Sequence, residues 1–539
     1  MRLNFPGIIG RLRWRFCGLT NIVMANEEEE RQGSLSMNLA RLLGTFMFLA
    51  LASCATNKQS ALSSAQRAEI ARIDESLKLV ANHQFAEAEA VIQPVIHSKH
   101  FGRLPSAEQY RALLTAAKLS FTLKEPTLEY ESRVRLLALP QATSNDRMSR
   151  VNAAARLGDT REIVISLTEL VDRNPERLMP ADERFVIRVL RDGRKQLPPG
   201  STLPLLQALY AAHWKLKWDQ EPSAFWQDLA LLLLEQNRLP EAIEVSSLVS
   251  YEYDIISMRV DRRFDAITEA NPARFDVEAA LKRDLEHFQS AAEGAPKSLA
   301  PKTAVIDDLL EEQHYGAALA AADGVIADIR LRSDPKQWYD DFDELYAWVL
   351  DARSRALERL GRWDDALDQL AAAGWVSENN GKNVSQVINL GELYGDLGKP
   401  KEALGSLLRL GSDISAYGRM QEAAVRLDAA VQLGDTEQAD KWLAFIKEHR
   451  TDAPRTYEVA LLLTSDLESA AKWLIERLED KDLRSAALLS VQEYAAPLRT
   501  PRQAELERRR RALIARPDVQ AEIQKVGRVE SFKIEAPGH

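Results

Sequence analysis

The sequence predicts an all-α fold in which helical hairpins stack into an α-solenoid. Leu, Ala, Glu and Arg are abundant along most of the 539 residues, and these residue types favour helix. No run alternates apolar and polar residues as a half-exposed strand would. A Leu-Gly turn recurs at Gly361, Gly398 and Gly434, and this spacing is typical of helical-repeat proteins.

Residues 1–36 differ in character from the start of an exported protein. An acidic run, Glu27-Glu28-Glu29-Glu30, stands where a signal peptide carries positive charge. If translation starts at Met37, the chain has the usual order of a signal peptide, because the basic residue Arg41 precedes an apolar core. We therefore expect residues 1–36 to be translated from a misplaced start. The alternative is a genuine cytosolic extension whose arginines contact a membrane surface; these are Arg11, Arg13 and Arg15.

Residues 37–53 have the layout of a signal peptide. The apolar run 42–52 is too short to span a membrane and has the length of a signal-peptide core. It ends at Leu51-Ala52-Ser53-Cys54, which resembles the bacterial lipobox. The resemblance implies that the Cys54 thiol is joined to diacylglycerol and that the new N-terminus is acylated, for example with palmitate. A buried helix with an incidental cysteine is the alternative.

The residues after Cys54 indicate where the protein is sorted. Lipoproteins with aspartate at the next position tend to stay in the inner membrane, whereas this chain has Ala55. The resemblance therefore implies a Gram-negative outer-membrane lipoprotein with its body in the periplasm. Residues 54–66 are small and polar, as in a flexible tether. Cys17 precedes the cleavage point, so the mature chain keeps one cysteine and forms no internal disulfide.

Proline and glycine breaks divide the rest of the chain. Residues 197–201 (Leu-Pro-Pro-Gly-Ser) and 292–296 (Ala-Glu-Gly-Ala-Pro) cannot continue a helix. The expected order is a first helical-repeat array at 67–196, a second helical segment at 204–292, a repeat array at 300–496, and charged helices with a tail at 502–539.

The clearest repeat resembles the tetratricopeptide repeat (TPR). Leu390, Gly391, Tyr394, Gly398 and Ala403 match its leucine-glycine, aromatic, turn and alanine positions. Small side chains at 391 and 403 let two antiparallel helices approach closely, and Gly398 suits the left-handed conformation that ends a helix. The resemblance implies a right-handed solenoid of TPR-like hairpins.

Neighbouring copies repeat the turn and the alanine that follows it. Gly361 precedes Ala366, and Gly434 precedes Ala439, at the same interval as in the best copy. Weaker copies lie at residues 85–88, 157–162, 226–242, 315–318 and 467–470. Beyond the repeats we expect a charged helix at 502–515, a short helix at 517–526 and only one strand, at 529–534.

The sequence carries no catalytic motif, and we expect no cofactor and no metal site. It has no glycine-rich phosphate loop, no His-Glu-x-x-His and no Gly-x-Ser-x-Gly. The net charge of −10 makes nucleic acid an unexpected partner.

Three features are candidate binding surfaces. Tyr210, Trp214 and Trp218 are four apart, so on one helix they would share a face that stacks on sugar rings or anchors a peptide; the alternative is core. Trp338 with Asp340 and Asp341 combines an aromatic with acids, which would either hold a basic peptide or lie at a helix N-terminus. Residues 508–511 are four arginines, either a solvated face or a site for anionic glycan or lipid headgroups.

Two classes of function follow. The first is a lipid-anchored scaffold whose superhelix binds an envelope protein or peptide, while the acylated Cys54 binds the outer membrane. The second is a glycan-binding or glycan-cleaving protein that resembles superhelical lytic transglycosylases. Such an enzyme needs a lysozyme-like domain, and residues 480–539 are too few to form one. The sequence therefore favours the scaffold, and not an enzyme.

Overall fold

The computed structural model describes residues 62–178, 183–378, 381–411 and 414–537. Contacts between Cα atoms divide these residues into two units, an N-terminal unit at residues 62–232 and a C-terminal unit at 233–537. Both units consist almost entirely of helices, which confirms the all-α prediction. The lipobox, the signal peptide and residues 1–36 lie outside the described residues.

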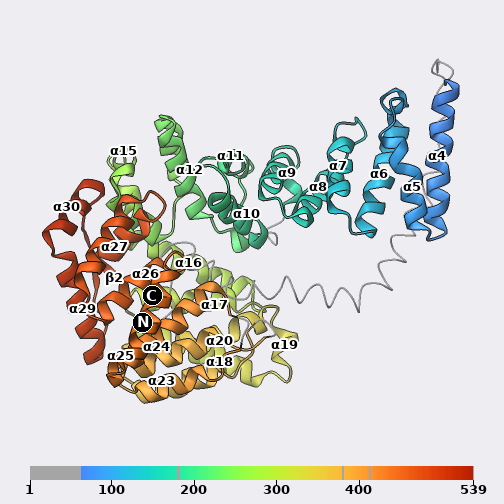
Figure 1. Ribbon diagram of the computed structural model, residues 1–539. Coiled ribbons are helices and arrows are strands. Elements are labelled where there is room, and N and C mark those ends of the chain that lie inside the picture. The colour runs from blue at the N-terminus through green and yellow to red at the C-terminus, as the bar shows by residue number, and fades with distance from the viewer. Residues whose placement is uncertain (1–61, 179–182, 379–380, 412–413, 538–539) are drawn as a thin grey trace. The chain divides into compact units, whose positions relative to one another are not determined.

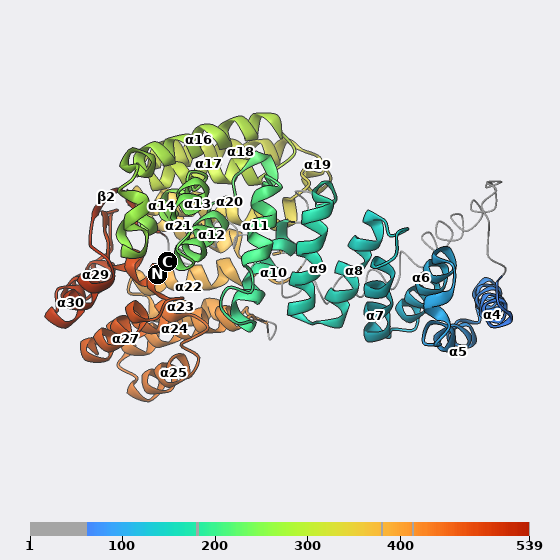
Figure 2. The same cartoon turned by 90° about the horizontal axis from the view of Figure 1, so that it is seen from above.

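The helices of the N-terminal unit follow one another in chain order (Figure 1 and Figure 2). From α4 to α9 each packs on the next, and α10 and α11 both pack on α9. Its elements are α4 (Ser64–Ala81), α5 (Phe85–Ile96), η2 (Phe101–Arg103), α6 (Ser106–Thr122), α7 (Pro126–Leu137), α8 (Ser144–Leu157), α9 (Thr160–Arg173), η3 (Pro175–Arg177), α10 (Glu183–Gln196), α11 (Leu203–Ala211) and η5 (Lys217–Asp219). Helix α12 (Ser223–Glu235) begins in this unit and ends in the next.

The expected tether is shorter than the sequence suggests. Helix α4 already begins at Ser64, because Ser63 and Gln66 form a reciprocal capping box that satisfies the free backbone N–H groups at the helix start. The last three residues of the predicted tether, 64–66, are therefore helical.

The C-terminal unit contains the best repeats and all of the strands that the structure describes. Its elements are α13 (Leu239–Ser246), α14 (Glu252–Val260), η6 (Arg262–Phe264), α15 (Asp265–Thr268), η7 (Pro272–Phe275), α16 (Val277–Gly294), α17 (Ala300–Glu311), α18 (Tyr315–Leu331), α19 (Pro335–Trp338), α20 (Phe342–Arg359), α21 (Trp363–Ala373), α22 (Ser385–Asp396), α23 (Pro400–Leu407), α24 (Ala416–Leu433), α25 (Thr436–Glu448), α26 (Pro454–Leu463), α27 (Leu467–Glu479), α28 (Arg484–Val491), β1 (Glu493–Ala495), α29 (Pro501–Ile514), α30 (Pro517–Val526) and β2 (Ser531–Glu535).

Hairpins in both units are closed by one turn geometry. A single residue with positive φ ends the first helix, and the next residue donates its N–H to the carbonyl five positions back, as in a Schellman motif. At Gly398, φ is 71°, and the Lys399 N–H donates to the Tyr394 carbonyl at 2.9 Å. The same pair of features occurs with His83, Asn237, Gln313, Gly361, Gly434 and Ser465 as the left-handed residue.

The helices of the best repeat pack closely at Gly391 and Ala403. A β-carbon on Gly391 would lie 2.9 Å from the Ser406 hydroxyl and 3.0 Å from a Val425 methyl group, so the helices cross here at close range. Ala403 is fully buried, and so is Ala366 in the preceding repeat. Ala439 is only half-buried, and Ile446 is the one fully buried residue of α25.

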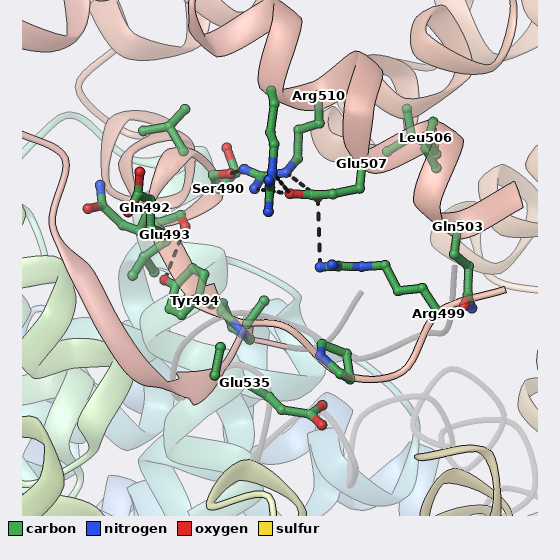
Figure 3. A pocket seen from close by; sticks show the side chains of 18 of the residues that line it. Ser490, Gln492, Glu493, Tyr494, Arg499, Gln503, Leu506, Glu507, Arg510 and Glu535 are labelled. Atoms are coloured by element: carbon green, nitrogen blue, oxygen red, sulfur yellow. Dashed lines mark hydrogen bonds and ion pairs between the residues drawn. The ribbon is translucent and has the colours of Figure 1, made fainter. Parts of the chain in front are cut away.

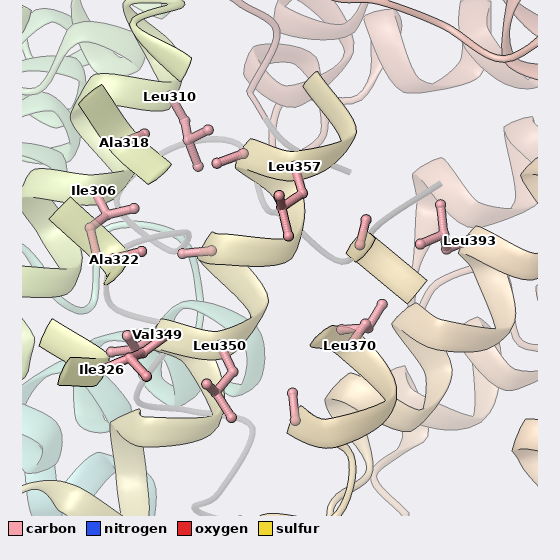
Figure 4. Close-up of a cluster of buried hydrophobic side chains, with 14 of the residues drawn as sticks. Ile306, Leu310, Ala318, Ala322, Ile326, Val349, Leu350, Leu357, Leu370 and Leu393 are labelled. Atoms are coloured by element: carbon pink, nitrogen blue, oxygen red, sulfur yellow. The ribbon is translucent and has the colours of Figure 1, made fainter. Parts of the chain in front are cut away.

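The alanine five positions after the left-handed residue packs the two helices of a hairpin together. Ala88, Ala242, Ala318 and Ala470 occupy this position in the weaker copies, and each is fully buried. One apolar cluster of this unit joins the hairpins α17–α18 and α20–α21 with helix α22 of the next hairpin (Figure 4). Ile306, Ala322, Leu357 and Leu393 are among its members. Hairpins with degenerate sequence therefore pack like the best copy.

The hairpins define two edges of the C-terminal array. We call the first helix of each hairpin an A helix (α17, α20, α22, α24, α26) and the second a B helix (α18, α21, α23, α25, α27). Because each turn is tight, A and B helices run antiparallel. The turn edge carries the A-to-B turns at residues 312–314, 360–362, 397–399, 434–435 and 464–466. The inter-repeat edge carries the B-to-A loops, described at 332–341, 374–378, 381–384, 408–411, 414–415 and 449–453.

Two strands form a short parallel pair near the C-terminus. Tyr494 of β1 pairs with Phe532 of β2, and Glu493 pairs with Ser531. The predicted strand at 529–534 is thus found with shifted bounds, whereas β1 was not predicted. The expectation of a single strand was wrong because β1 is only three residues long and gains its partner from a distant part of the chain. None of the described helices has the length and apolar character that a membrane span requires.

Candidate functional site

The chain after the last repeat packs against the array. We call residues 493–537 the C-terminal segment; it comprises β1, α29, α30 and β2 (Figure 1). The predicted helices at 502–515 and 517–526 are α29 and α30, within one residue of the expected bounds. Helix α29 contacts α22, α26 and α27, and α30 contacts α27. The repeats therefore do not end in an exposed last helix.

The C-terminal segment contacts the turn edge at successive hairpins. The contacts, in order along the array, are Gln313 Nε2 to the Lys533 carbonyl (3.0 Å), the Arg359 guanidinium to Glu535 (2.9 Å), Leu498 within 3.1 Å of a β-carbon position on Gly361, Gln503 Nε2 to Asp396 (2.8 Å), Arg502 to Asp428, Arg509 to the Leu462 carbonyl (2.8 Å) and Arg516 to Glu468 (2.9 Å). One continuous stretch of chain thus covers the turn edge.

Two of these contacts neutralise charges that are largely removed from solvent. Arg359 binds Glu535 through two guanidinium nitrogens, and the side chains are 22% and 10% exposed. Burial opposes the charged form of Arg359, but Glu535 more than compensates, so the pKa of Arg359 is raised. Burial raises the pKa of Asp428, and the Arg502 guanidinium only partly offsets that effect. The turn edge therefore depends on charges supplied by the C-terminal segment.

A glycine lets the segment approach the array before β2. Gly527 forms an antiparallel bridge with Asp261, just after α14. A β-carbon on Gly527 would collide with the Val260 carbonyl oxygen and would lie 2.6 Å from a Leu488 methyl carbon. Its φ of −165° is ordinary extended backbone, so close approach and not backbone strain requires glycine here.

A cavity of about 790 Å³ lies between the A helices and the C-terminal segment. Figure 3 shows its wall on the side of the C-terminal segment, where α29 and the chain around β1 face the opening. The A helices contribute side chains from α17, α20, α22 and α26 to the opposite wall. A volume of this size holds a short peptide or a comparable ligand.

One end of the cavity is rich in arginine. Glu507 accepts hydrogen bonds from Arg510 (2.8 Å) and Arg511 (2.9 Å), and Arg499 lies 4.0 Å away (Figure 3). Burial alone would raise the pKa of Glu507, but these three arginines lower it to about 2. Arg455 lines the same cavity, and burial lowers its pKa to about 10 despite the nearby Glu458 carboxylate. This end has more positive than negative charge.

Carboxylates line the cavity as well. Glu311, Glu358 and Glu535 are part of its wall together with Arg355 and Arg359. Tyr494 also lines the cavity, donates its hydroxyl to the Leu489 carbonyl at 3.1 Å, and has its pKa raised by burial. The cavity therefore presents charges of both signs, which suits a ligand that carries both.

The four arginines predicted as a headgroup site divide into two groups. Arg508 and Arg511 are exposed and pair with glutamates of their own helix. Arg509 donates to the carbonyls of Leu462 and Leu463, and Arg510 donates to the Ser490 carbonyl at 2.9 Å. Half of the cluster therefore holds α29 to the array instead of forming a solvated face.

The predicted aromatic stripe does not lie on one helix, so that interpretation was wrong. Helix α11 ends at Ala211, and His213 has a φ of 48° that terminates it. Tyr210 packs edge-on against Trp226, and Trp214 is only 6% exposed and stacks on Phe225. Trp218 lies beyond, in η5. Trp214 thus belongs to the core, which was the alternative, whereas Tyr210 and Trp218 are half-buried.

Trp338, Asp340 and Asp341 do not converge on a pocket. Asp341 accepts hydrogen bonds from the backbone N–H groups of Leu299 (2.8 Å) and Ala300 (3.0 Å), at the start of α17. It therefore satisfies a helix N-terminus, as the alternative proposed, although the helix is the preceding one and not its own. Trp338 is half-buried beneath Arg332, and Asp340 is exposed.

The sequence did not reveal the residues that build the cavity. Arg359, Glu507 and Glu535 resemble ordinary surface charges of helical chains. Arg359 and Glu535 are paired with each other from distant parts of the chain, whereas Glu507 pairs with arginines of its own helix. Among the residues that the structure describes, no group of three or more His, Cys, Asp or Glu side chains has the geometry of a metal site.

No family model and no curated protein matches this chain. Among solved structures, one of Naa15/Naa10 bound to HypK-THB is 14% identical, with a TM-score of 0.23, over 78% of this chain and 65% of that chain. This chain thus spans slightly less than two thirds of that protein. The P58(IPK) TPR domain is 14% identical (TM-score 0.18; 74% of this chain, 99% of that one), and yeast Tom70 is 12% identical (TM-score 0.20; 86% and 100%). The hairpins described above are themselves the basis for calling this chain a TPR-like helical-repeat protein.

Proposed function

We propose that this protein is a lipid-anchored scaffold of a Gram-negative outer membrane, and that it binds a segment of an envelope protein in its cavity. The observation that carries the proposal is the cavity of about 790 Å³, whose wall contains both arginines and carboxylates. A peptide segment carries charges of both signs and fits such a site, whereas an apolar ligand leaves these charges desolvated.

The anchor is the acylated Cys54, and the body of the protein lies in the periplasm. The lipobox of residues 51–54, preceded by a short apolar run, supports this part of the proposal. Attachment through several acyl chains is stable, whereas one chain binds a membrane only marginally. The partner then belongs to an envelope or cell-wall assembly pathway, because only such proteins share the compartment.

Photo-crosslinking in intact cells tests the cavity. A photoreactive amino acid is placed at Leu498 or Val529, which line the cavity and are 51% and 37% exposed. Leu433, 45% exposed but not part of the lining, is the control. We expect one shared crosslinked protein from both cavity positions and none from the control. Arg499→Glu should abolish the crosslink, since it reverses charge at the arginine-rich end; a crosslink that survives it would contradict cavity binding.

Labelling with palmitate tests the anchor separately. We expect Cys54→Ala to prevent incorporation of labelled palmitate, because only the thiol can accept the lipid. Equal labelling of this variant and the parent would exclude lipidation at Cys54 and leave the cavity proposal intact. A gene that starts at Met37 should yield the same mature protein as the long form.

A further inference from the structure

The inter-repeat edge bears the most exposed large apolar side chains that the structure describes. Leu331 and Leu408 are each 84% exposed, and Trp375 is 78% exposed. The next most exposed, Phe121, reaches 54%. Each of the three lies where a B helix ends: Leu331 is the last residue of α18, Trp375 follows α21, and Leu408 follows α23. They therefore occupy equivalent places in three successive hairpins and lie along one edge.

Arginine accompanies each of these apolar side chains. Leu331 stands between Arg330 and Arg332, and Leu408 directly precedes Arg409. The Arg409 guanidinium lies 3.6 Å from the centre of the Trp375 ring and donates to the Gly374 carbonyl at 2.6 Å. Trp338 on the same edge repeats the pairing, since Arg332 lies 4.1 Å from its ring centre; Arg332 also pairs with Asp328 at 2.7 Å.

Three acids of these loops are engaged by the protein itself, whereas Asp340 and Asp452 are exposed. Asp341 accepts from the start of α17, and Asp334 accepts from the Gln337 N–H at 3.1 Å. Glu378 is buried and accepts from the Val384 N–H (2.9 Å) and the Ser385 hydroxyl (2.7 Å). The protruding groups of the edge are consequently apolar side chains with cations beside them.

We propose that the inter-repeat edge of the C-terminal array inserts Leu331, Trp375 and Leu408 into the interfacial region of a lipid bilayer that contains anionic headgroups. Tryptophan and arginine suit this region, because each has an apolar body and a polar end that stays in water. Single apolar side chains on separate loops need no matching pockets in a fluid interface. The arginines supply charge complementarity to anionic lipid. This inference is independent of lipidation at Cys54 and of the cavity.

Environment-sensitive labels on the two edges of the array test the proposal. The full-length chain carries Cys17→Ser and Cys54→Ser, and one cysteine is introduced as Leu331→Cys, Trp375→Cys or Leu408→Cys and coupled to a nitrobenzoxadiazole dye. Leu360→Cys and Leu433→Cys are matched controls, because these leucines are exposed on the turn edge at 42% and 45%. The vesicles contain phosphatidylethanolamine and phosphatidylglycerol, with or without brominated acyl chains.

We expect a blue shift and bromine quenching at positions 331, 375 and 408, and neither at 360 nor 433. The comparison holds even where another part of the chain attaches to the vesicle, because both edges belong to the same molecule. Equal signals on the two edges, or silence at all three inter-repeat positions, would overturn the proposal; silence would favour a protein partner or a second copy. A shift that persists in pure phosphatidylcholine and in high salt would refute the role of the arginines.

Discussion

The two edges of the C-terminal array are built from the same hairpins and meet different surroundings. The turn edge is partly covered by residues 493–537, which contact each hairpin at or near this edge, from Gln313 to Glu468. The inter-repeat edge carries three large apolar side chains that are at least 78% exposed. Repeats alone make the hairpins nearly equivalent, so the chain beyond the repeats decides which edge remains open for binding.

The first test removes most of the C-terminal segment from the turn edge. A chain that ends at Thr500 lacks α29, α30 and β2, so Asp428 and Arg359 lose the partners of their mostly buried charges. Stripping a partner from a buried charge is strongly destabilising, and we expect the free energy of unfolding to fall by more than about 3 kcal/mol. Urea unfolding measures the loss, and hydrogen exchange locates it.

Exchange should quicken at the turn edge, around residues 359–362, 395–399 and 428–435, and stay unchanged around 374–378. Arg508→Ala is the control, because Arg508 is 77% exposed and pairs only with Glu505 among the described residues. If both edges lose protection equally, the C-terminal segment stabilises the array as a whole and the comparison of edges fails.

The second test disrupts the packing between helices in the interior of the array, which supports both edges. Gly391→Leu forces a side chain against Ser406 and Val425, and such overpacking costs about 1–3 kcal/mol. Gly405→Leu is the matched control in the same hairpin, since a β-carbon there meets nothing within 4 Å. We expect the control to keep or slightly raise stability, because leucine favours helix by about 1 kcal/mol over glycine.

Because neighbouring repeats stabilise one another, the loss of protection should spread from α22 and α23 to α20 and α24 on both edges. Residues 70–195 should exchange as in the parent. A silent Gly391→Leu would show that this hairpin is not closely packed.

The third test uses pH to weaken the ion pairs around Glu507 in the C-terminal segment without removing the segment. The Glu507 pKa is lowered to about 2 in the folded protein by Arg510, Arg511 and Arg499, against an ordinary value of 4.5. A lowered folded pKa adds stability that is complete above the unfolded pKa and is lost as pH falls through the folded one. Arg511 is 69% exposed, so solvent screens part of this interaction, and we expect about 1–2 kcal/mol to be lost between pH 4.5 and pH 2.

Urea unfolding at several pH values measures this slope, and Glu507→Gln should flatten it. Glu448→Gln, at the exposed end of α25, controls for the loss of a surface carboxylate. An unchanged slope in Glu507→Gln would mean that other carboxylates dominate the acid sensitivity.

The helices and the best hairpins could be predicted from local sequence, whereas the packing of the C-terminal segment on the turn edge could not. Gly361, Gly398 and Gly434 predict their turns because glycine readily adopts the left-handed conformation that ends a helix. His83, Gln313 and Ser465 adopt the same conformation with φ between 60° and 64°, so their hairpins were predicted only as weak copies. The alanine five positions later is the more regular signal, because the side chain at this position must be small wherever two helices cross closely.

The cavity depends on contacts between parts of the chain that no local pattern links. Arg359 and Glu535 are 176 positions apart, and nothing in their surroundings distinguishes them from solvated charges. The prediction of an aromatic stripe was wrong because a spacing of four residues places side chains on one face only as long as the helix continues. His213 ends that helix between Tyr210 and Trp214.

The last test, with the smallest expected effect on stability, concerns the open edge. Trp375→Ser removes a ring that touches mainly Arg409 and solvent, so the free energy of unfolding should change by no more than about 0.5–1 kcal/mol. Trp473→Ser is the contrast: this ring is 8% exposed and donates its indole N–H to the Pro454 carbonyl at 2.8 Å, and its removal should cost about 3–5 kcal/mol. Urea unfolding compares the two, and vesicle binding should weaken in Trp375→Ser although the fold is intact. A large loss of stability in Trp375→Ser would mean that this tryptophan supports the array, and the inter-repeat edge would then not be a free surface.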